Sequence, residues 1–572
     1  MKNYLAPLFI IFIITAYCMQ ASAQSDKNFP SNQKDKILLE FVDDGYVPSH
    51  RQDHPVSPAY KYSSPGFFTV QVNVDEDGNN ILGDAANEPS ITVDPNDPNK
   101  IAIGWRQFDN VNNNFRQAGI GFSADAGQTW TFPGVIDPGV FRSDPVLDYD
   151  NEGNFYYNSL TVVGEDYLCD VYRSDDGGET WDEGVYAYGG DKQWMTIDHS
   201  EGIGAGNLYA YWTSYYSICY PDFFTRSVNG GDSWEDCVSI DGEPYWGTLT
   251  VDADGNLYIG GISWNGFRVI RSSTAQDPDA FVTWDYDSQV NLDGELVGFG
   301  GYQCPNPSGL LGQTIIDCDR SEGPNHGNVY LLASVQRYSN NDPCDVMFSK
   351  STNGGLTWST ATRINDDPAN SYNYQWFGTM SVAPDGRIDV VWLDTRDNPG
   401  TVYSVLYYSY SMDGGDSWSE NVPLSDFFDP HLGWPDQDKM GDYFDMISDE
   451  TGAHLAWANT FNGEQDVYYA HIIPSTTGIN KELNVLNKNM LQNYPNPFKH
   501  NTSIRYNLNQ DGFVSIKIYD VSGREVATVV NEEKSAGQYI VNFNASGLVG
   551  GLYYSTLTIG SSKVTRKMMI MN

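Results

Sequence analysis

Ser123-Ala-Asp125-Ala-Gly127-Gln-Thr129-Trp130 is an eight-residue pattern that recurs along the chain. Further copies run from Ser174 to Trp181, from Ser227 to Trp234, from Ser351 to Trp358 and from Ser411 to Trp418. Asp or Asn occupies the third position of every copy, at Asp125, Asp176, Asn229, Asn353 and Asp413. This side chain can accept hydrogen bonds from backbone N–H groups of its own loop, and the glycine two residues later supplies a positive φ. Five copies of one turn indicate a chain built from a repeated unit.

The repeated unit has the pattern of a short antiparallel sheet: an apolar strand, a turn, a second strand, a third strand that leads into the eight-residue turn, and a short fourth strand. Its predicted first strands are 91–94, 146–148, 195–198, 248–252, 314–317, 379–382 and 444–447. The seventh unit ends without the turn and without a fourth strand. Residues 67–74 alternate between apolar and polar side chains, so we expect this strand to complete the seventh sheet and close a ring.

The recurring turn resembles the Asp box, or BNR repeat, of sialidase-like β-propellers, and the resemblance covers most of residues 66–474. It implies an all-β, seven-bladed propeller. A six-bladed ring is the alternative, if the fourth unit or the region of Cys304 and Cys318 is an insertion. In that family the box lies on the rim between the third and fourth strands, away from the catalytic centre. The resemblance therefore gives the five box side chains a structural role.

Both ends of the chain carry segments of a different kind. Residues 1–23 have the Lys2 charge, the apolar run and the Ala21-Ser22-Ala23 site of a secretory signal peptide, and residues 24–65 are predicted to be a polar leader. Residues 475–489 are predicted to be a linker, and the alternating strands of residues 490–572 predict a small β-sandwich of about the immunoglobulin scale.

Motifs of this last segment, such as Asn493-Tyr494-Pro495-Asn496-Pro497 and Gly551-Leu-Tyr553, resemble the type A C-terminal sorting domain of the type IX secretion system. The resemblance implies that residues 490–572 engage the type IX secretion machinery. It further implies export through the periplasm and outer membrane, removal of the tail, and a secreted or cell-surface protein.

Composition excludes some partners. The 572 residues carry a net charge of −43, and residues 490–572 contribute +3, which leaves −46 for the rest. Such an acidic body repels nucleic acid and anionic membrane surfaces. After the signal peptide, no apolar run is long enough to form a transmembrane helix.

Metal and disulfide patterns are limited. Turns such as Asp75-Glu-Asp77-Gly, Asp148-Tyr-Asp150 and Asp252-Ala-Asp254-Gly resemble the start of calcium loops, but none continues into the full loop. We therefore interpret them as hairpin turns and predict no cofactor, with calcium binding by the acidic body as the alternative. Six cysteines follow the signal peptide. Cys219 and Cys237 flank one box and suit a cross-strand disulfide, Cys304 with Cys318 could close a loop, and Cys169 with Cys344 remain.

Side chains that precede the seven first strands should converge at one mouth of a propeller channel. The candidates for ligand binding are Arg142, Asp191, Trp194, Tyr245, Trp246, Gln375 and Trp376. Aromatic faces stack on sugar rings, while amides and carboxylates bond to hydroxyl groups, so this set suits an extracellular glycan. The alternative is that these polar groups only satisfy free backbone groups or line a water-filled channel.

Four residues of the same mouth are candidates for catalysis: Glu88, Asp144, Asp442 and Tyr443. Paired carboxyl groups can hydrolyse a glycoside when one is held protonated and the other is ionised. The sialidase family uses three arginines, a tyrosine nucleophile and an aspartate; here only Arg142 falls on the mouth and the family's Arg-Ile-Pro motif is absent. The sequence therefore favours glycan recognition, with glycoside hydrolysis as an open extension. The alternatives are a non-catalytic propeller for adhesion or protein binding and, with less support because no histidine lies nearby, a polysaccharide lyase.

Overall fold

The computed structural model describes residues 44–474, except 50, 165 and 299–302, and residues 491–571, except 495, 497, 509–510, 522 and 561. The predicted signal peptide, residues 24–43 of the predicted leader and the predicted linker at 475–489 lie outside the described residues. Within the described parts, no helix has the length and apolar character needed to cross a membrane.

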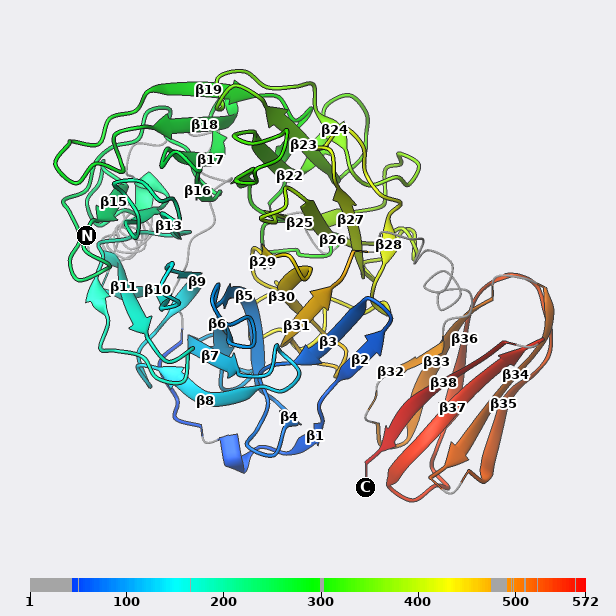
Figure 1. Ribbon diagram of the computed structural model, residues 1–572. Coiled ribbons are helices and arrows are strands. Elements are labelled where there is room, and N and C mark those ends of the chain that lie inside the picture. The colour runs from blue at the N-terminus through cyan, green and yellow to red at the C-terminus, as the bar shows by residue number, and fades with distance from the viewer. Residues whose placement is uncertain are drawn as a thin grey trace, which may run out of the picture. The chain divides into compact units, whose positions relative to one another are not determined.

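Seven antiparallel sheets follow one another in the first described part, and Figure 1 shows them arranged in a ring. The first three sheets are β5 (Ala85–Val93), β6 (Ile101–Phe108), β7 (Gln117–Ser123) and β8 (Thr131–Ile136); β9 (Ser143–Tyr149), β10 (Phe155–Val163), β11 (Asp166–Ser174) and β12 (Val185–Tyr186); and β13 (Trp194–Ile197), β14 (Leu208–Tyr211) and β15 (Phe224–Ser227). The fourth and fifth sheets are β16 (Leu249–Val251), β17 (Leu257–Ser263), β18 (Gly266–Ser272) and β19 (Tyr286–Val290); and β20 (Gly294–Leu296), β21 (Ile315–Cys318), β22 (Val329–Arg337), β23 (Asp345–Ser351) and β24 (Thr362–Arg363). The sixth sheet is β25 (Gln375–Val382), β26 (Ile388–Asp394), β27 (Val405–Ser411) and β28 (Val422–Pro423), and the seventh is β29 (Asp445–Ser448), β30 (Ala453–Asn459) and β31 (Asp466–Ile472) with β3 (Phe67–Gln71) and β2 (Lys61–Ser64).

One edge strand of each sheet faces the centre of the ring. These inner strands are β5, β9, β13, β16, β21, β25 and β29; each contacts the next, and β29 contacts β5. Side chains bridge them, because neighbouring inner strands share no continuous backbone ladder and their N–H groups still need acceptors. The N–H of Leu147 donates to Ser90 Oγ (2.9 Å), that of Ile197 to Asp148 Oδ2 (2.8 Å), and that of Ile91 to Asp445 Oδ2 (3.1 Å). The last of these bonds joins the final sheet to the first.

The N-terminal strand completes the last sheet. Strand β3 pairs antiparallel with β31, with Phe67 opposite Ile472 and Gln71 opposite Tyr468, which confirms the predicted closing strand. Ordered structure begins earlier than predicted, because β2 extends this sheet and β1 (Val56–Pro58) pairs with β4 (Asn79–Ile81) after the short 3-10 helix η2 (Arg51–Asp53). Part of the predicted polar leader is therefore built into the folded domain.

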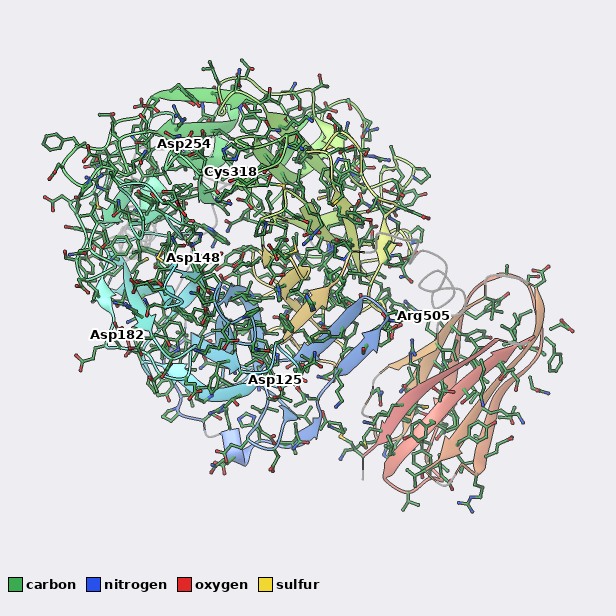
Figure 2. All side chains as sticks on the ribbon, in the orientation of Figure 1. Asp125, Asp148, Asp182, Asp254, Cys318 and Arg505 are labelled. Atoms are coloured by element: carbon green, nitrogen blue, oxygen red, sulfur yellow. A yellow bond between two sulfur atoms is a disulfide. The ribbon has the colours of Figure 1, made fainter. Side chains whose placement is uncertain are left out.

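The five recurrent turns share one hydrogen-bond pattern. In the first copy, Ser123 Oγ accepts the N–H of Gly127 (2.9 Å) and donates to Asp125 Oδ1 (2.8 Å), and that oxygen also accepts the N–H of Thr129 (2.9 Å). The serine-to-glycine bond recurs in the copies at Asp176, Asn229, Asn353 and Asp413. The turns follow third strands and thus lie at the opposite end of each sheet from the start of its inner strand. In Figure 2, Asp182, just after the second copy, lies at the outer edge of the ring, whereas Asp148 lies on inner strand β9.

The second described part contains two antiparallel sheets around a single apolar core. One sheet is β32 (Leu491–Tyr494), β33 (Asn501–Leu508) and β36 (Gly537–Asn544); the other is β35 (Glu525–Lys534), β34 (Gly512–Asp520), β37 (Gly551–Ile559) and β38 (Ser562–Ile570). Buried Val514, Ile516 and Ile518 alternate along β34, as the sequence pattern predicts for a strand with one face in the core.

One predicted disulfide forms and another does not. Cys219 and Cys237 are bonded, with Cα atoms 6.4 Å apart. The pairing of Cys304 with Cys318 is wrong, because Cys318 lies on inner strand β21 and its Sγ donates to Val251 O (3.2 Å), while Cys304 lies in another apolar cluster. Cys169 and Cys344 form no disulfide either, and both are buried.

Candidate functional site

A residue with positive φ lies at or just before the start of every inner strand in the described ring. These residues are Glu88 (53°), Asp144 (47°), Lys192 (58°), Trp246 (55°), Gly312 (132°), Phe377 (54°) and Gly441 (86°). In β5 the pairing with β6 skips from Asn87 to Ser90, which marks a bulge at Glu88. A side chain other than glycine in this conformation costs about 1–3 kcal/mol, and such strain is concentrated at functional sites. These residues therefore mark the start of the inner strands as a candidate site.

Charged side chains from these positions meet in one group, which we call the central cluster. Its members are Glu88, Arg106, Asp144, Asp191, Lys192, Lys439 and Asp442. Lys192 Nζ lies 3.0 Å from Asp442 Oδ2, 3.5 Å from Asp191 Oδ1 and 3.7 Å from Asp144 Oδ2. One ammonium group thus joins carboxyl groups that the sequence separates by more than 250 residues.

Two further cations form ion pairs with carboxyl groups of the central cluster. Lys439 Nζ lies 2.9 Å from Asp442 Oδ2, and Arg106 Nε lies 2.9 Å from Glu88 Oε2. Gly441 leaves room for Glu88 beside the segment that carries Lys439 and Asp442, because a Cβ on it would lie only 2.7 Å from Glu88 Cγ. No member of the cluster is more than 7% exposed, so the cluster is closed to solvent in this structure.

Two of the carboxyl groups have pKa values that are raised to near neutral pH. Burial raises the pKa of Glu88 to about 7, although Arg106 opposes the shift. Burial also raises the pKa of Asp191 to about 7, although Lys192 opposes it. Each group is therefore partly protonated under physiological conditions and can donate a hydrogen bond.

The other two carboxyl groups are held ionised. Burial acts to raise the pKa of Asp144, but the ammonium of Lys192 and the charges of Arg106 and Lys439 outweigh it and lower this pKa. In Asp442 the attraction of Lys192 and Lys439 likewise outweighs burial and lowers the pKa, and Asp442 Oδ1 accepts the N–H of Leu310 (2.7 Å). The cluster thus combines carboxyl groups that can be protonated with others that remain charged.

Hydrogen-bonding capacity is left over at the starts of three neighbouring inner strands. Both carboxylate oxygens of Asp191, the indole N–H of Trp246 and both polar side-chain atoms of Gln313 are buried and have no hydrogen-bond partner among the described residues, although Asp191 Oδ1 lies 3.5 Å from Lys192 Nζ. The three residues precede β13, β16 and β21, which are adjacent in the ring. Buried polar groups in native proteins are almost always satisfied, so this position calls for water or a polar ligand.

Aromatic side chains lead from this position toward solvent. The ring of Tyr245 lies 5.1 Å from that of Trp246 and 5.7 Å from that of Trp264, in the β17–β18 turn. Trp264 is 37% exposed and Tyr245 is half-buried, whereas Trp246 is buried. Of the predicted binding aromatics, Tyr245 and Trp246 thus border the position with unsatisfied polar groups.

Other predicted binding residues have partners elsewhere. Arg142 is ion-paired with Asp137 and Asp170 (2.8 Å each). Gln375 Nε2 donates to Asp394 (3.1 Å), and Trp376 Nε1 donates to Ser404 Oγ (3.0 Å) inside an apolar cluster. These three side chains support the packing of their own sheets instead of the central cluster.

Tyr443 and Trp194 form a buried edge-to-face pair, with ring centroids 5.0 Å apart. The Tyr443 hydroxyl donates to Pro145 O (2.8 Å), and burial raises its pKa well above the usual value. A tyrosine nucleophile needs an adjacent base and a lowered pKa, and this hydroxyl has the opposite environment.

Sequence reasoning missed Arg106 and Lys439 as members of the site. Arg106 lies on second strand β6, where its neighbours in sequence are buried, so a charged residue in a buried strand was the available signal. Lys439 lies in the long connection before β29. Gln313 is expected at the predicted mouth, because it precedes an inner strand; it directly follows Gly312, which has a positive φ, and lies just before β21.

In the calcium-like turns, aspartate oxygens accept hydrogen bonds from backbone N–H groups of the same turn. Asp252 Oδ1 accepts the N–H groups of Asp254 (3.0 Å) and Asn256 (2.9 Å), and Asp75 Oδ1 accepts those of Asp77 and Asn79. These bonds are those of hairpin turns. The described residues contain no group of three or more His, Cys, Asp or Glu side chains arranged to hold a metal ion.

Comparison with known proteins identifies the tail. Residues 492–571 match the family described as secretion system C-terminal sorting domain. This type IX sorting domain indicates export and a surface or secreted localisation, and it implies interaction with the secretion machinery. No curated protein matches the chain.

Several solved structures are similar to the chain at low identity. A protein of unknown function from Dyadobacter fermentans is 14% identical with a TM-score of 0.40, and the match covers 72% of this chain and 100% of that one. PorZ, a surface component of the type IX secretion system of Porphyromonas gingivalis, is 13% identical with a TM-score of 0.28, over 89% and 73%. A sialidase from Trypanosoma rangeli is 8% identical with a TM-score of 0.37, over 88% of each chain.

Proposed function

We propose that the protein is an exported, seven-bladed Asp-box β-propeller that recognises a glycan at the end of the ring where the inner strands begin. The seven sheets, the contact between β29 and β5 and the closing strand β3 support seven blades, and the two sheets of the tail support an immunoglobulin-like sandwich. The tail supplies export, so the propeller meets its ligand outside the cell.

The unsatisfied polar groups of Asp191, Trp246 and Gln313 carry this proposal. They offer a donor, an amide with both donor and acceptor, and a carboxyl group within one sector of the ring. Sugar hydroxyl groups both donate and accept hydrogen bonds, so a polyhydroxylated ligand can satisfy all of them. Tyr245 and Trp264 lie beside them and offer the aromatic faces on which sugar rings stack.

Replacement of Gln313 tests the proposal. Gln313→Leu removes a buried amide that has no partner, so the free energy of unfolding should be unchanged or higher. If the amide serves a ligand, binding on a glycan array and by titration calorimetry should weaken by at least about tenfold. A matched surface test is Trp264→Ala, which should weaken binding, beside Phe281→Ala as its control, since Phe281 is 93% exposed between a third and a fourth strand.

The outcomes separate the alternatives. Absence of binding to every glycan tested would favour the adhesion or protein-binding propeller. Equal binding by wild-type protein and Gln313→Leu would show that the ligand, if a glycan, lies elsewhere on the molecule.

A glycosidase is a second candidate, favoured by the divided pKa values of the central cluster. Glu88 and Asp191, each with a pKa near 7, suit a general acid, while Asp144 and Asp442 stay ionised as a base or nucleophile requires. All four carboxyl groups are buried, so this function requires the cluster to open to the substrate. Turnover of fluorogenic glycosides should then be lost in Asp191→Asn and in Asp144→Asn, and kcat/KM should fall above about pH 7. Binding without turnover would leave the protein as a lectin-like module.

A further inference from the structure

Four tyrosines form a second aromatic group at the same end of the ring, which we call the tyrosine cluster: Tyr167, Tyr215, Tyr216 and Tyr220. Tyr167 lies at the start of β11, and the other three lie in the loop between β14 and β15, which contains the 3-10 helix η3 (Ser214–Tyr216). Ring centroids are 5.5 Å apart for Tyr167 and Tyr216, and 5.9 Å apart for Tyr215 and Tyr220. Tyr220 is 55% exposed and the other three are half-buried, so the cluster presents aromatic surface to solvent.

This loop is fixed directly against the proposed site. The N–H of Thr213 donates to Asp191 O (3.0 Å), and the N–H of Ile218 donates to Gly189 O (3.0 Å). The tyrosine cluster is thus attached to the segment that carries Asp191, whose carboxyl group is one of the unsatisfied groups.

A covalent link holds the far side of the loop. The disulfide between Cys219 and Cys237 joins the loop to the segment that follows β15. A binding surface held in place in this way loses little conformational entropy when a ligand arrives. The loop is therefore built as a rigid platform and not as a flexible connection.

Charge around the platform selects the kind of ligand. Residues 161–250 contain 17 Asp and Glu, four of them in the recurrent turns at the opposite end of the sheets, but only three Lys and Arg: Arg173, Lys192 and Arg226. Lys192 and Arg226 are buried, at 2% exposed, and Arg226 is paired with Glu235. Asp166 and Glu243 are exposed near the same end of these sheets, and Asp222 is half-buried there. Such a surface repels anionic sugars, and salt weakens this repulsion because the charges are exposed.

We propose that the tyrosine cluster is a second sugar subsite and that the ligand is a neutral oligosaccharide, which extends from the site at Asp191, Trp246 and Gln313 across the platform. The inference rests on the proposed glycan-binding function and specifies its substrate class. Sialylated, sulfated and uronate-containing chains are disfavoured by the acidic surroundings, and a single sugar unit would fill only the first subsite.

Titration calorimetry with oligosaccharides of defined length tests this inference. The probes are cello-, xylo- and manno-oligosaccharides of one to six units, with sialyllactose and oligogalacturonate as anionic probes, in low and high salt. We expect the affinity of wild-type protein for one neutral series to rise with length and exceed that for the anionic probes. Tyr220→Ala should weaken binding of the longer chains by about tenfold and leave the shortest bound chain unaffected.

Tyr338→Ala is the matched control, because Tyr338 is 66% exposed and follows β22 at the same end of another sheet. Length dependence that survives in Tyr220→Ala and Tyr216→Phe/Tyr220→Ala, or a preference for the anionic probes, would overturn the subsite while leaving glycan recognition intact. Failure of every glycan to bind would overturn the proposed function itself, and with it the subsite.

Discussion

At the scale of single residues, the central cluster shows how the centre of the ring can hold seven ionisable groups without solvent. Lys192 Nζ lies within 4 Å of three carboxyl groups, and its pKa is raised well above the usual value because their attraction outweighs burial. A buried charge is tolerated in the folded state only while the oppositely charged groups around it are present. Each member therefore has a structural role in addition to any role in binding.

Lys192→Met is expected to destabilise the protein strongly. The change preserves side-chain length but leaves Asp144, Asp191 and Asp442 buried with less compensation, at a cost of about 3–5 kcal/mol in the free energy of unfolding. Lys350→Met is the control, since Lys350 pairs with Asp416, which is 73% exposed, and its loss should cost no more than about 1 kcal/mol. Denaturant titration of both variants measures the difference, and equal costs would contradict the role of Lys192.

Stability should also depend on pH in a defined direction. The pKa values of Glu88 and Asp191 are about 7 in the folded protein and near 4 in an unfolded chain. Between these values the folded state binds more protons, so the free energy of unfolding should fall as pH rises from about 4.5 to 7. Glu464, whose pKa burial raises to about 7, acts in the same direction.

Denaturant titrations at several pH values measure this slope. The double variant Glu88→Gln/Asp191→Asn should have a shallower slope, because both groups no longer titrate. A wild-type free energy of unfolding that rises from pH 4.5 to 7 would be the contradicting result.

At the scale of elements, the recurrent turn packs each sheet on the one before it. Gly415, in the last copy, has φ of 83°, and a Cβ there would lie 2.4 Å from a ring carbon of Phe348 in the preceding sheet. Gly231 and Gly355 contact Tyr156 and Tyr258 of their preceding sheets in the same way. The glycine thus serves two needs, the positive φ and the close approach of the neighbouring sheet.

Gly400 and Gly415 have similar φ values, so substitutions at these two positions test the two needs separately. Gly400 has φ of 75° but nothing within 4 Å of an added Cβ. Gly400→Ala should cost about 1–2 kcal/mol of backbone strain. Gly415→Ala should cost about 1–3 kcal/mol more, because the methyl group also displaces Phe348. Thermal denaturation compares the two, and equal losses would show that Phe348 adapts freely.

At the scale of the whole molecule, export and recognition belong to separate parts of the chain. The sorting domain occupies residues 492–571 and has its own apolar core, whereas the charged and aromatic groups of the proposed site lie in the ring. Deletion of 491–572 should therefore retain the protein in the periplasm while the ring still folds. Cell fractionation with immunoblotting measures the location, a carrier protein fused to 491–572 is the positive control, and undiminished export of the deletion would contradict the assignment.

Much of the architecture could be predicted from the sequence. The predicted inner strand at 379–382 lies within β25, that at 444–447 overlaps β29, and the predicted pairing of the N-terminal strand with the last sheet is confirmed. These features repeat at a regular interval or alternate with period two, and both signals are local in sequence. Glu88, Asp144, Asp191 and Asp442 were also found as neighbours at one mouth, because topology alone brings the starts of inner strands together.

The sequence alone therefore determined the repeated turn, the sheets and the sorting domain, since each depends on residues close together in the chain. Only the tertiary structure decided which charges meet. Arg106 and Lys439 entered the central cluster from a second strand and a long connection, Arg142 turned to Asp137 and Asp170, and Cys318 took a backbone carbonyl instead of Cys304. Side-chain direction and burial depend on packing between sheets that are distant in sequence, and local patterns do not encode them.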